Sequence, residues 1–318
     1  EDKKVAEVSV MLKRAALQLA AVTVSGNNRF LSNTLSSVDI RLRPINSSQD
    51  LLRMVPGLFI AQHAGGGKAE QIFMRGYDID HGTDVSISVD GMPVNMVSHA
   101  HGQGYADLHF VIPELVDKMQ FDKGPYFAGY GNLATAGYVS LQTADFLQKQ
   151  FVKVEAGDFG SFRSSAAVKL LDKTKNDLRS QWYVAGEYLR TDGYFESPQD
   201  FSRYNLFTKY TTELSRNTRL SVSLSNFSSK WYASGQIPQR AVDQGLITRF
   251  GAIDDTEGGN TGRTNVNAKL FHKINDKWST NQQLYYTAYN FNLFSNFTFY
   301  LNYPTDGDGI QQYEKRQI

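Results

Sequence analysis

Residues 219–225 read Arg-Leu-Ser-Val-Ser-Leu-Ser, a strict alternation of polar and apolar side chains. Because successive side chains on a β-strand point to opposite faces, Leu220, Val222 and Leu224 share one face and three serines share the other. Similar alternation marks about seven segments, near 150–157, 163–171, 180–191, 203–213, 218–228, 263–274 and 277–294. Most of them run about ten residues, so residues 149–318 are predicted to form antiparallel strands.

The connections and the aromatic residues indicate what kind of sheet this is. Long connections at 192–202 and 229–262 fall at one end of the predicted strands, and short ones at the other, except the tight first connection at 157–161. Residues 149–318 also hold 28 aromatic residues, against 12 before them. Transmembrane β-barrels have this pattern of strands, loops and aromatic residues. A soluble sandwich alternates as well, but its strands are shorter, so the pattern favours a barrel.

Composition excludes several classes of function. The chain has 318 residues, a net charge of +1 and no cysteine. The balanced charge gives no electrostatic reason to expect nucleic acid as a partner. The lack of cysteine excludes disulfide scaffolds, thiolate metal sites and cysteine nucleophiles. No apolar run approaches ~18 residues and no signal peptide is recognisable, so we expect no transmembrane helix.

A series of short motifs precedes the alternating segments. Ser47 or Ser48 is a plausible N-cap for a helix that Pro56-Gly57 ends. Ile-Phe-Met-Arg-Gly follows at 72–76, and an Asp-Gly turn closes an extended run within 85–94. Residues 113–119 are predicted to form a short helix with proline at its start.

The order of these motifs resembles the plug domain of a TonB-dependent outer-membrane receptor. The resemblance rests on VPG, MRG, VDGMPV, IPELVDKMQFDKGP and YGNLATAGYVSLQT, and covers about Val22–Thr143. It departs from the family at Lys123, where the family usually has arginine, so the usual plug–barrel ion pair is not expected there.

The resemblance implies the domain organisation. Residues 1–18 would end an N-terminal extension, 19–26 would be a TonB-box-like segment, 27–148 a mixed α+β plug domain, and 149–318 the N-terminal part of an outer-membrane β-barrel. A plugged barrel of about 22 strands needs about three times as many strand residues. The chain is therefore expected to hold an incomplete barrel of about seven strands.

The resemblance also implies TonB-dependent active import of a scarce solute, such as a metal chelate, cofactor or glycan, across the bacterial outer membrane. The expected partners are a periplasmic TonB-type energy-transducing protein, a small-molecule or metal-complex ligand, and outer-membrane lipid. The partner protein would pair by strand addition with the box-like residues Leu19, Ala20, Ala21, Val22, Thr23 and Val24. That segment could instead be an ordinary first strand of the plug.

Two other functions stay open at this point. The chain could belong to a ligand-sensing receptor that signals through an N-terminal extension, or to a soluble β-rich secreted enzyme. No Ser/His/Asp or paired-carboxylate constellation stands out, so we expect neither an enzyme nor a bound cofactor.

Five of the six histidines lie between residues 63 and 109. If the plug resemblance holds, the loops at 61–70, 77–84 and 95–108 face outward, toward the solute. The residues expected to contact it are His63, His81, His99, His101, Gln103, Tyr105, Trp231 and Tyr232, together with loop aromatics such as Tyr194 and Phe195.

His99 and His101 lie on the same side of an extended segment. Imidazoles close to carboxylate or thioether groups suit zinc, copper or nickel, so a metal site is one hypothesis. The alternative is that the histidines form hydrogen bonds that hold a long loop. Their spacing matches no closed metal site, which favours the alternative.

Overall fold

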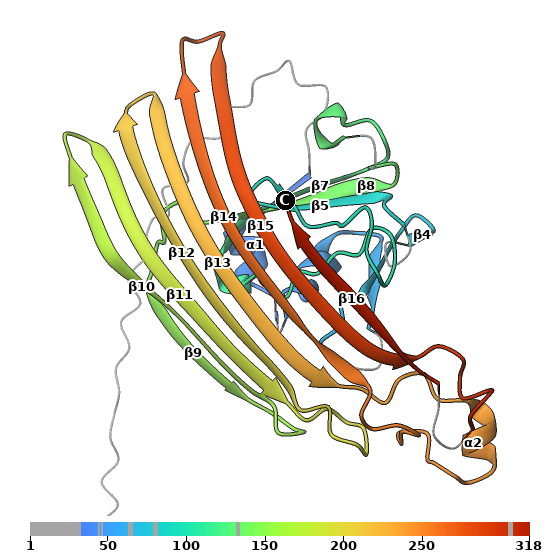
Figure 1. Ribbon diagram of the computed structural model, residues 1–318. Helices are drawn as coiled ribbons and strands as arrows, with labels where there is room; N and C mark the ends of the chain where they lie inside the picture. Colours follow the sequence, from blue (N-terminus) through green and yellow to red (C-terminus); the bar gives the residue numbers. More distant parts are fainter. Residues whose placement is uncertain are drawn as a thin grey trace, which may run out of the picture. The chain divides into compact units, whose positions relative to one another are not determined.

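The computed structural model describes residues 33–318, except for residues 44, 46, 63–65, 79–81, 132–133 and 305–307. The described part contains sheets of eight, five and three strands (Figure 1). None of its helices is long and apolar enough to cross a membrane. The predicted N-terminal extension and TonB-box-like segment lie outside the described residues.

The eight-stranded sheet follows the chain order. Its strands are β9 (Phe151–Ala156), β10 (Phe162–Lys175), β11 (Leu178–Thr191), β12 (Phe201–Ser215), β13 (Thr218–Tyr232), β14 (Gly258–Lys273), β15 (Ser279–Asn296) and β16 (Gly309–Gln317). Each strand pairs antiparallel with the next, so β9 and β16 are the two edges of an open sheet. The predicted incomplete barrel is confirmed.

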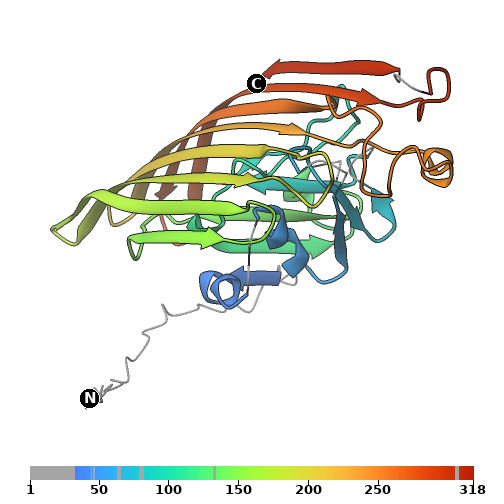
Figure 2. The ribbon, with the colours of Figure 1, turned by 90° about the horizontal axis from the view of Figure 1, so that it is seen from below.

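The alternation in the sequence separates the two faces of this sheet. Ser221, Ser223 and Ser225 are buried, whereas Val222 and Leu224 are each 39% exposed. The polar face is the one that the elements of residues 33–147 cover, along the concave side of the sheet (Figure 2). The apolar residues are left on the outer face, as lipid would require.

The strands differ from the prediction in length and number. The six strands β10–β15 have 14 to 18 residues, not about ten. The sequence prediction missed β16, because that strand reads Gly-Ile-Gln-Gln-Tyr-Glu-Lys-Arg-Gln and has almost no apolar alternation. The long loop predicted at 229–262 is shorter and contains α2 (Gln239–Asp243).

Two smaller sheets form the first part of the fold. The five-stranded sheet has the order β1 (Asn33–Ser36), β7 (Val116–Lys123), β8 (Gly137–Thr143), β5 (Val85–Val89), β6 (Met92–Pro93). The three-stranded sheet consists of β2 (Leu58–Ala61), β3 (Gln71–Met74) and β4 (Tyr77–Asp78). The helices are α1 (Ser37–Arg41) and the 3-10 helices η1 (Gln49–Met54), η2 (Pro113–Leu115) and η3 (Ala128–Tyr130). The boundary near residue 148 between plug and barrel stays a prediction.

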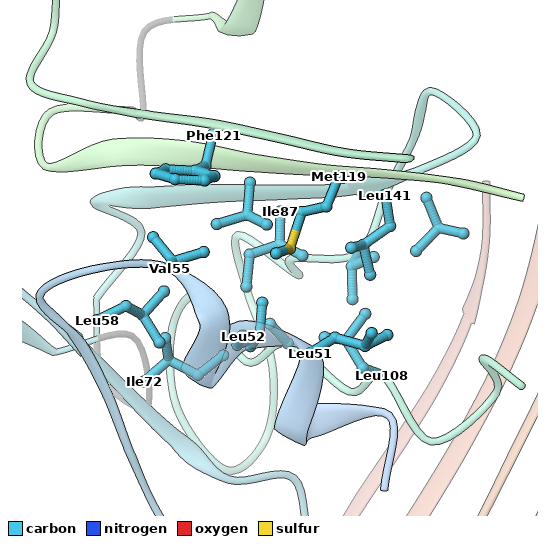
Figure 3. Close-up of a cluster of buried hydrophobic side chains, with 14 of the residues drawn as sticks. Leu51, Leu52, Val55, Leu58, Ile72, Ile87, Leu108, Met119, Phe121 and Leu141 are labelled. Atoms are coloured by element: carbon cyan, nitrogen blue, oxygen red, sulfur yellow. The ribbon is translucent and has the colours of Figure 1, made fainter. Parts of the chain in front are cut away.

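One buried core joins η1 to these sheets. Leu51 and Leu52 of η1 are fully buried against Ile87, Met119 and Leu141 (Figure 3). The predicted turn between β5 and β6 is present, with positive φ at both Asp90 and Gly91. The Asp90 carboxylate then accepts hydrogen bonds from the backbone N–H and the hydroxyl of Thr143, at 2.9 and 2.6 Å.

The prediction of a helix at 113–119 is correct for its first turn only and wrong for the residues that follow. Only Pro113–Leu115 is helical, and β7 begins at Val116. Val116, Met119 and Phe121 are buried, while Asp117 is exposed. The residues after Leu115 form a strand instead of a helix because β7 pairs with both β1 and β8. These pairings satisfy the backbone groups of β7 on both sides.

Candidate functional site

Several hydrogen bonds cross the contact between the plug and the eight-stranded sheet. The backbone oxygen of Asp90 accepts hydrogen bonds from Asn267 Nδ2 at 3.2 Å and Gln283 Nε2 at 3.0 Å. Arg263 Nη2 donates to the backbone oxygen of Pro93 at 3.1 Å. The side chains of β14 and β15 therefore bind the backbone of the β5–β6 hairpin.

A buried ionic network crosses the same contact. Arg163 of β10 is 4% exposed and binds Glu114 of η2 and Glu187 of β11. Glu187 also accepts from Arg203 of β12 at 2.8 Å. Burial alone would raise the pKa of Glu114, but the hydrogen bonds and charge of Arg163 outweigh it and hold that pKa below its usual value. The carboxylate is therefore ionised and fixed on the guanidinium.

The segment that follows β8 is attached to the sheet as well. Lys209 Nζ donates to the backbone oxygen of Thr143 at 3.1 Å and lies 3.1 Å from Asp145 Oδ1. The Tyr183 hydroxyl donates to the backbone oxygen of Ala144 at 2.7 Å. This segment joins the last plug strand to β9, so these bonds fix where the plug chain enters the sheet.

Several of the predicted solute contacts lie in one aromatic cluster. The rings of His99 and Tyr105 stack with centroids 4.2 Å apart, and Phe291 of β15 lies 4.8 Å from His99. Trp231 belongs to the same cluster and is 1% exposed. A Cβ on Gly67 would stand 2.1 Å from Trp231 Cε3, so the plug backbone lies directly on the indole.

The other predicted contacts are less buried. His101 Nδ1 lies 3.0 Å from Gln312 Oε1 of β16, while Gln103 is exposed and Tyr232 is half-buried. His63 and His81 lie outside the described residues. The structure thus brings together His99, His101, Tyr105 and Trp231. Solute binding by any of these residues stays a prediction.

The histidine pair has no further metal ligands in the described part of the chain. Among those residues no three His, Asp or Glu side chains come close enough to hold a metal ion. Instead, His99 Nδ1 accepts the backbone N–H of His101 at 3.1 Å. This bond is of the kind expected if the histidines hold the loop.

A cavity of about 530 Å³, with many polar residues in its lining, lies between the plug and β10–β12 and was not expected from the sequence. Gln49, Asp50 and Glu70 line it from the plug, and Gln199 and Arg203 line it from the sheet. Its walls come from several segments that are distant in the sequence, so no local motif marks it. The only signal was the pair of loop aromatics, Tyr194 and Phe195, which lie in its wall.

The model of one protein family matches this chain. Residues 30–138 match the TonB-dependent receptor plug domain. This range contains the described strands β1–β7 and the start of β8.

Solved receptor structures share the fold. The copper transporter OprC is 16% identical with a TM-score of 0.61, over 86% of this chain and 39% of that one. The unliganded ferric citrate transporter FecA is 14% identical with a TM-score of 0.67, over 84% and 40%. An enterobactin-bound mutant of the ferric enterobactin receptor PfeA from Pseudomonas aeruginosa is 15% identical with a TM-score of 0.57, over 87% and 44%.

This chain therefore spans less than half the length of the solved receptors that it matches, and at these identities the likeness shows the fold. The family match and the fold agree on the order of the parts. Residues 30–138 match the plug domain of TonB-dependent receptors, and the antiparallel strands that follow share the fold of the solved receptors.

Proposed function

We propose that the chain belongs to an active importer of a scarce solute across the bacterial outer membrane. The solute would bind at the outward-facing plug loops and the sheet loops, and a TonB-type protein would displace the plug to open a path. The apolar outer face of β9–β16 would contact outer-membrane lipid.

The observation that carries this proposal is how the plug is attached. Among the described residues of the plug's main buried cluster, Phe227 alone comes from the eight-stranded sheet. The plug thus has a core of its own, and both polar bonds and two smaller apolar clusters attach it to the sheet. Water can replace the polar bonds as they break, so that part of the contact separates with little loss, while the two apolar clusters must also separate when the plug moves.

The solute class is part of the proposal. The similar structures bind or carry, by their names, copper, ferric enterobactin and ferric citrate. A metal chelate, a cofactor or a glycan would each suit a plugged barrel. Among the described residues of the predicted set, His101, Gln103 and Tyr232 are not buried and are the first candidates for contact with a solute.

The energy-transducing partner would bind Leu19–Val24 by strand addition. Residues 1–318 contain no cysteine, so a cysteine introduced there is the only one in this part of the receptor. In the full-length receptor, Val22→Cys should form a disulfide with a cysteine placed in the periplasmic domain of the TonB-type protein. The exposed loop position Leu246→Cys is the control and should not react.

Transport is then measured in cells with and without Leu19–Val24. Copper, ferric enterobactin and ferric citrate serve as probes, together with a mixture of neutral oligosaccharides. If the cells take up one of these probes and lose that uptake when Leu19–Val24 is deleted, the result supports import. Uptake that survives the deletion, with loss of solute-induced gene expression, would instead favour the alternative of a sensing receptor with an N-terminal signalling extension.

A further inference from the structure

The cavity of about 530 Å³ between η1, the β2–β3 connection and β10–β12 has the size of a small-molecule site. Gln49 and Arg53 reach it from η1, and Glu70 reaches it from the connection. Arg203 closes the sheet side. Of these residues, Arg203 also belongs to the ionic network described above.

Two deeply buried side chains in this cavity have a hydrogen-bonding atom with no partner among the described residues. Gln49 is 2% exposed, and the Ser48 hydroxyl donates to its Oε1 at 2.8 Å, which leaves its Nε2 unbonded. Arg203 is 1% exposed and binds Glu187 through Nη2, while its Nε is unbonded. An unmet buried donor costs about 1–3 kcal/mol, so each of these donors is expected to bond to a water molecule or to a bound ligand.

The cavity also contains an unmet acceptor. Glu70 Oε2 is buried and has no partner in the described part of the chain. Burial raises the pKa of Glu70 to about 7, while the nearby Arg53 acts in the opposite direction. A ligand that fits must therefore accept from Gln49 and Arg203 and also donate to Glu70. Hydroxyl groups do both.

The formal charges of the lining favour a neutral ligand. Arg53 lies 3.1 Å from Asp50, and Arg203 lies 2.8 Å from Glu187, so both guanidinium groups already have a carboxylate partner. A strongly anionic chelate would approach the carboxylates of Asp50 and Glu70, and a free cation would approach the two guanidinium groups. Neither finds a surplus of opposite charge.

Aromatic rings add to the wall of the cavity. Phe159 and Tyr194 both line it and are 58% and 60% exposed, and Phe195 stacks on Tyr194 at 4.4 Å. Phe159 has a φ of 57°, and its backbone oxygen accepts the N–H of Asp192 at 2.8 Å, which fixes the backbone at this position. The negative face of such rings attracts the polarised C–H groups of a sugar ring.

We propose that this cavity binds a neutral polyhydroxylated ring, that is, one sugar unit of a glycan or glycoside. Its hydroxyl groups meet the polar atoms of Gln49, Glu70 and Arg203, and its C–H face lies on Phe159 and Tyr194. Transport of that sugar rests on the proposed function, whereas its binding does not.

The test uses the full-length receptor in detergent and saturation-transfer NMR. The probes are the methyl glycosides of glucose, galactose, mannose and N-acetylglucosamine, with catechol and citrate as ligands that lack a polyhydroxylated ring. We expect at least one glycoside to bind through its ring C–H protons and to resist displacement by catechol or citrate. If none of the glycosides binds, only water occupies the cavity and the proposal is overturned. Displacement of a bound glycoside by catechol would also overturn it.

Variants locate the binding. Tyr194→Ala and Phe159→Ala should each weaken glycoside affinity about ten-fold, through loss of the aromatic face. The control is Tyr303→Ala, because Tyr303 is 64% exposed and lies in another loop. Equal weakening by the control, or full affinity in Tyr194→Ala and Phe159→Ala, contradicts the assignment.

A second pair separates hydrogen bonding from folding. Glu70→Gln keeps polar atoms at the site, so its glycoside affinity should stay within a few-fold of the wild-type value. Glu70→Leu should bind the glycoside at least ten-fold more weakly. Equal affinity in the two variants would overturn the role of Glu70. Deleting Leu19–Val24 should leave glycoside binding unchanged, so a failure of import and a failure of sugar binding are distinguishable.

Discussion

Glu114 of the plug and Arg163 of the sheet form a bidentate ion pair. Nη1 and Nη2 of Arg163 donate to Oε1 and Oε2 of Glu114, both at 2.7 Å. Because the planar guanidinium matches the two carboxylate oxygens, the pair fixes orientation as well as distance. It lies at the junction between η2 and β7, so it holds the start of a central plug strand against β10.

Replacing Glu114 with glutamine should loosen that junction. Arg163 keeps its contacts with Glu155 and Glu187, so the fold is retained. The loss of a charge-assisted pair should lower the free energy of local opening by about 2–3 kcal/mol. Hydrogen exchange should report this as a roughly 30- to 150-fold fall in the protection of Val116–Lys123.

The matched control is the exposed pair between Arg216 and Asp177, whose side chains are 83% and 84% exposed. Asp177→Asn should change protection by less than about 1 kcal/mol, since exposed pairs contribute little. If Asp177→Asn lowered the protection of β7 as much as Glu114→Gln does, the change in net charge, and not the loss of the buried pair, would explain the lower protection.

Gly67 and Trp231 form the closest backbone contact between the plug and the sheet that a substitution can probe. A Cβ at Gly67 would lie 2.1 Å from Trp231 Cε3. Gly67→Ala should therefore push the β2–β3 connection away from β13, at a cost of about 1–3 kcal/mol in unfolding free energy. The emission of Trp231, which is 1% exposed, should shift to longer wavelength.

Gly129→Ala is the control, because a Cβ there meets nothing within 4 Å and its φ is not positive. In a double-mutant cycle, Trp231→Ala should relieve most of the cost of Gly67→Ala. Costs that simply add would show that the two residues do not clash.

The sequence predicts the parts of this fold that depend on local pattern. The alternation at 219–225 placed three serines on the plug-facing side and three apolar residues outside, as observed. Where the pattern was weak, prediction failed: β16 is nearly all polar. At 113–119, proline gave the right start, but pairing with β1 and β8 overrides helix formation after Leu115.

The site was much less predictable, because it depends on residues that are distant in the sequence. Glu114 and Arg163 are 49 positions apart, and neither has a local motif that indicates an ion pair. Gln49 and Arg203 become informative only when burial shows that each has an unmet donor. The histidine cluster was visible in the sequence, but its packing on Tyr105 and Phe291 was not.

His99 should contribute to stability mainly through its ring. It stacks on Tyr105 at an interplanar angle of 3° and is 8% exposed. His99→Ala should cost about 2–4 kcal/mol, since it leaves a cavity among aromatic rings. His99→Phe keeps the ring but loses the bond from the His101 N–H, so it should cost about 1 kcal/mol. Thermal unfolding of the full-length receptor compares the two.

The same residues allow a test of the metal hypothesis. The structure orients both histidine rings through His101 N–H and Gln312, so we expect Zn²⁺ and Cu²⁺ to bind equally well to the wild type and to a His99→Ala/His101→Ala variant. Calorimetric titration measures this. Tighter binding by the wild type would show that the two imidazoles are metal ligands.

Glu70 should make the plug contact depend on pH. Burial raises its pKa in the folded protein to about 7, from 4.5 for an exposed glutamate. The folded state therefore binds a proton more tightly than the unfolded state does. This contribution to stability is fully present below pH 4.5 and is lost as the pH rises through about 7. Above that range, stability should no longer change on account of Glu70.

Hydrogen exchange of the segment that contains Gln71–Met74 can measure this loss, after correction for the intrinsic effect of pH on exchange. Protection of β3 in the wild type should fall between pH 4.5 and about pH 7. Glu70→Gln has no group that titrates there, so its protection should change less over the same interval. Equal slopes in the two proteins would mean that a different group controls the pH dependence, because glutamine preserves the size of the side chain while removing the proton-binding site.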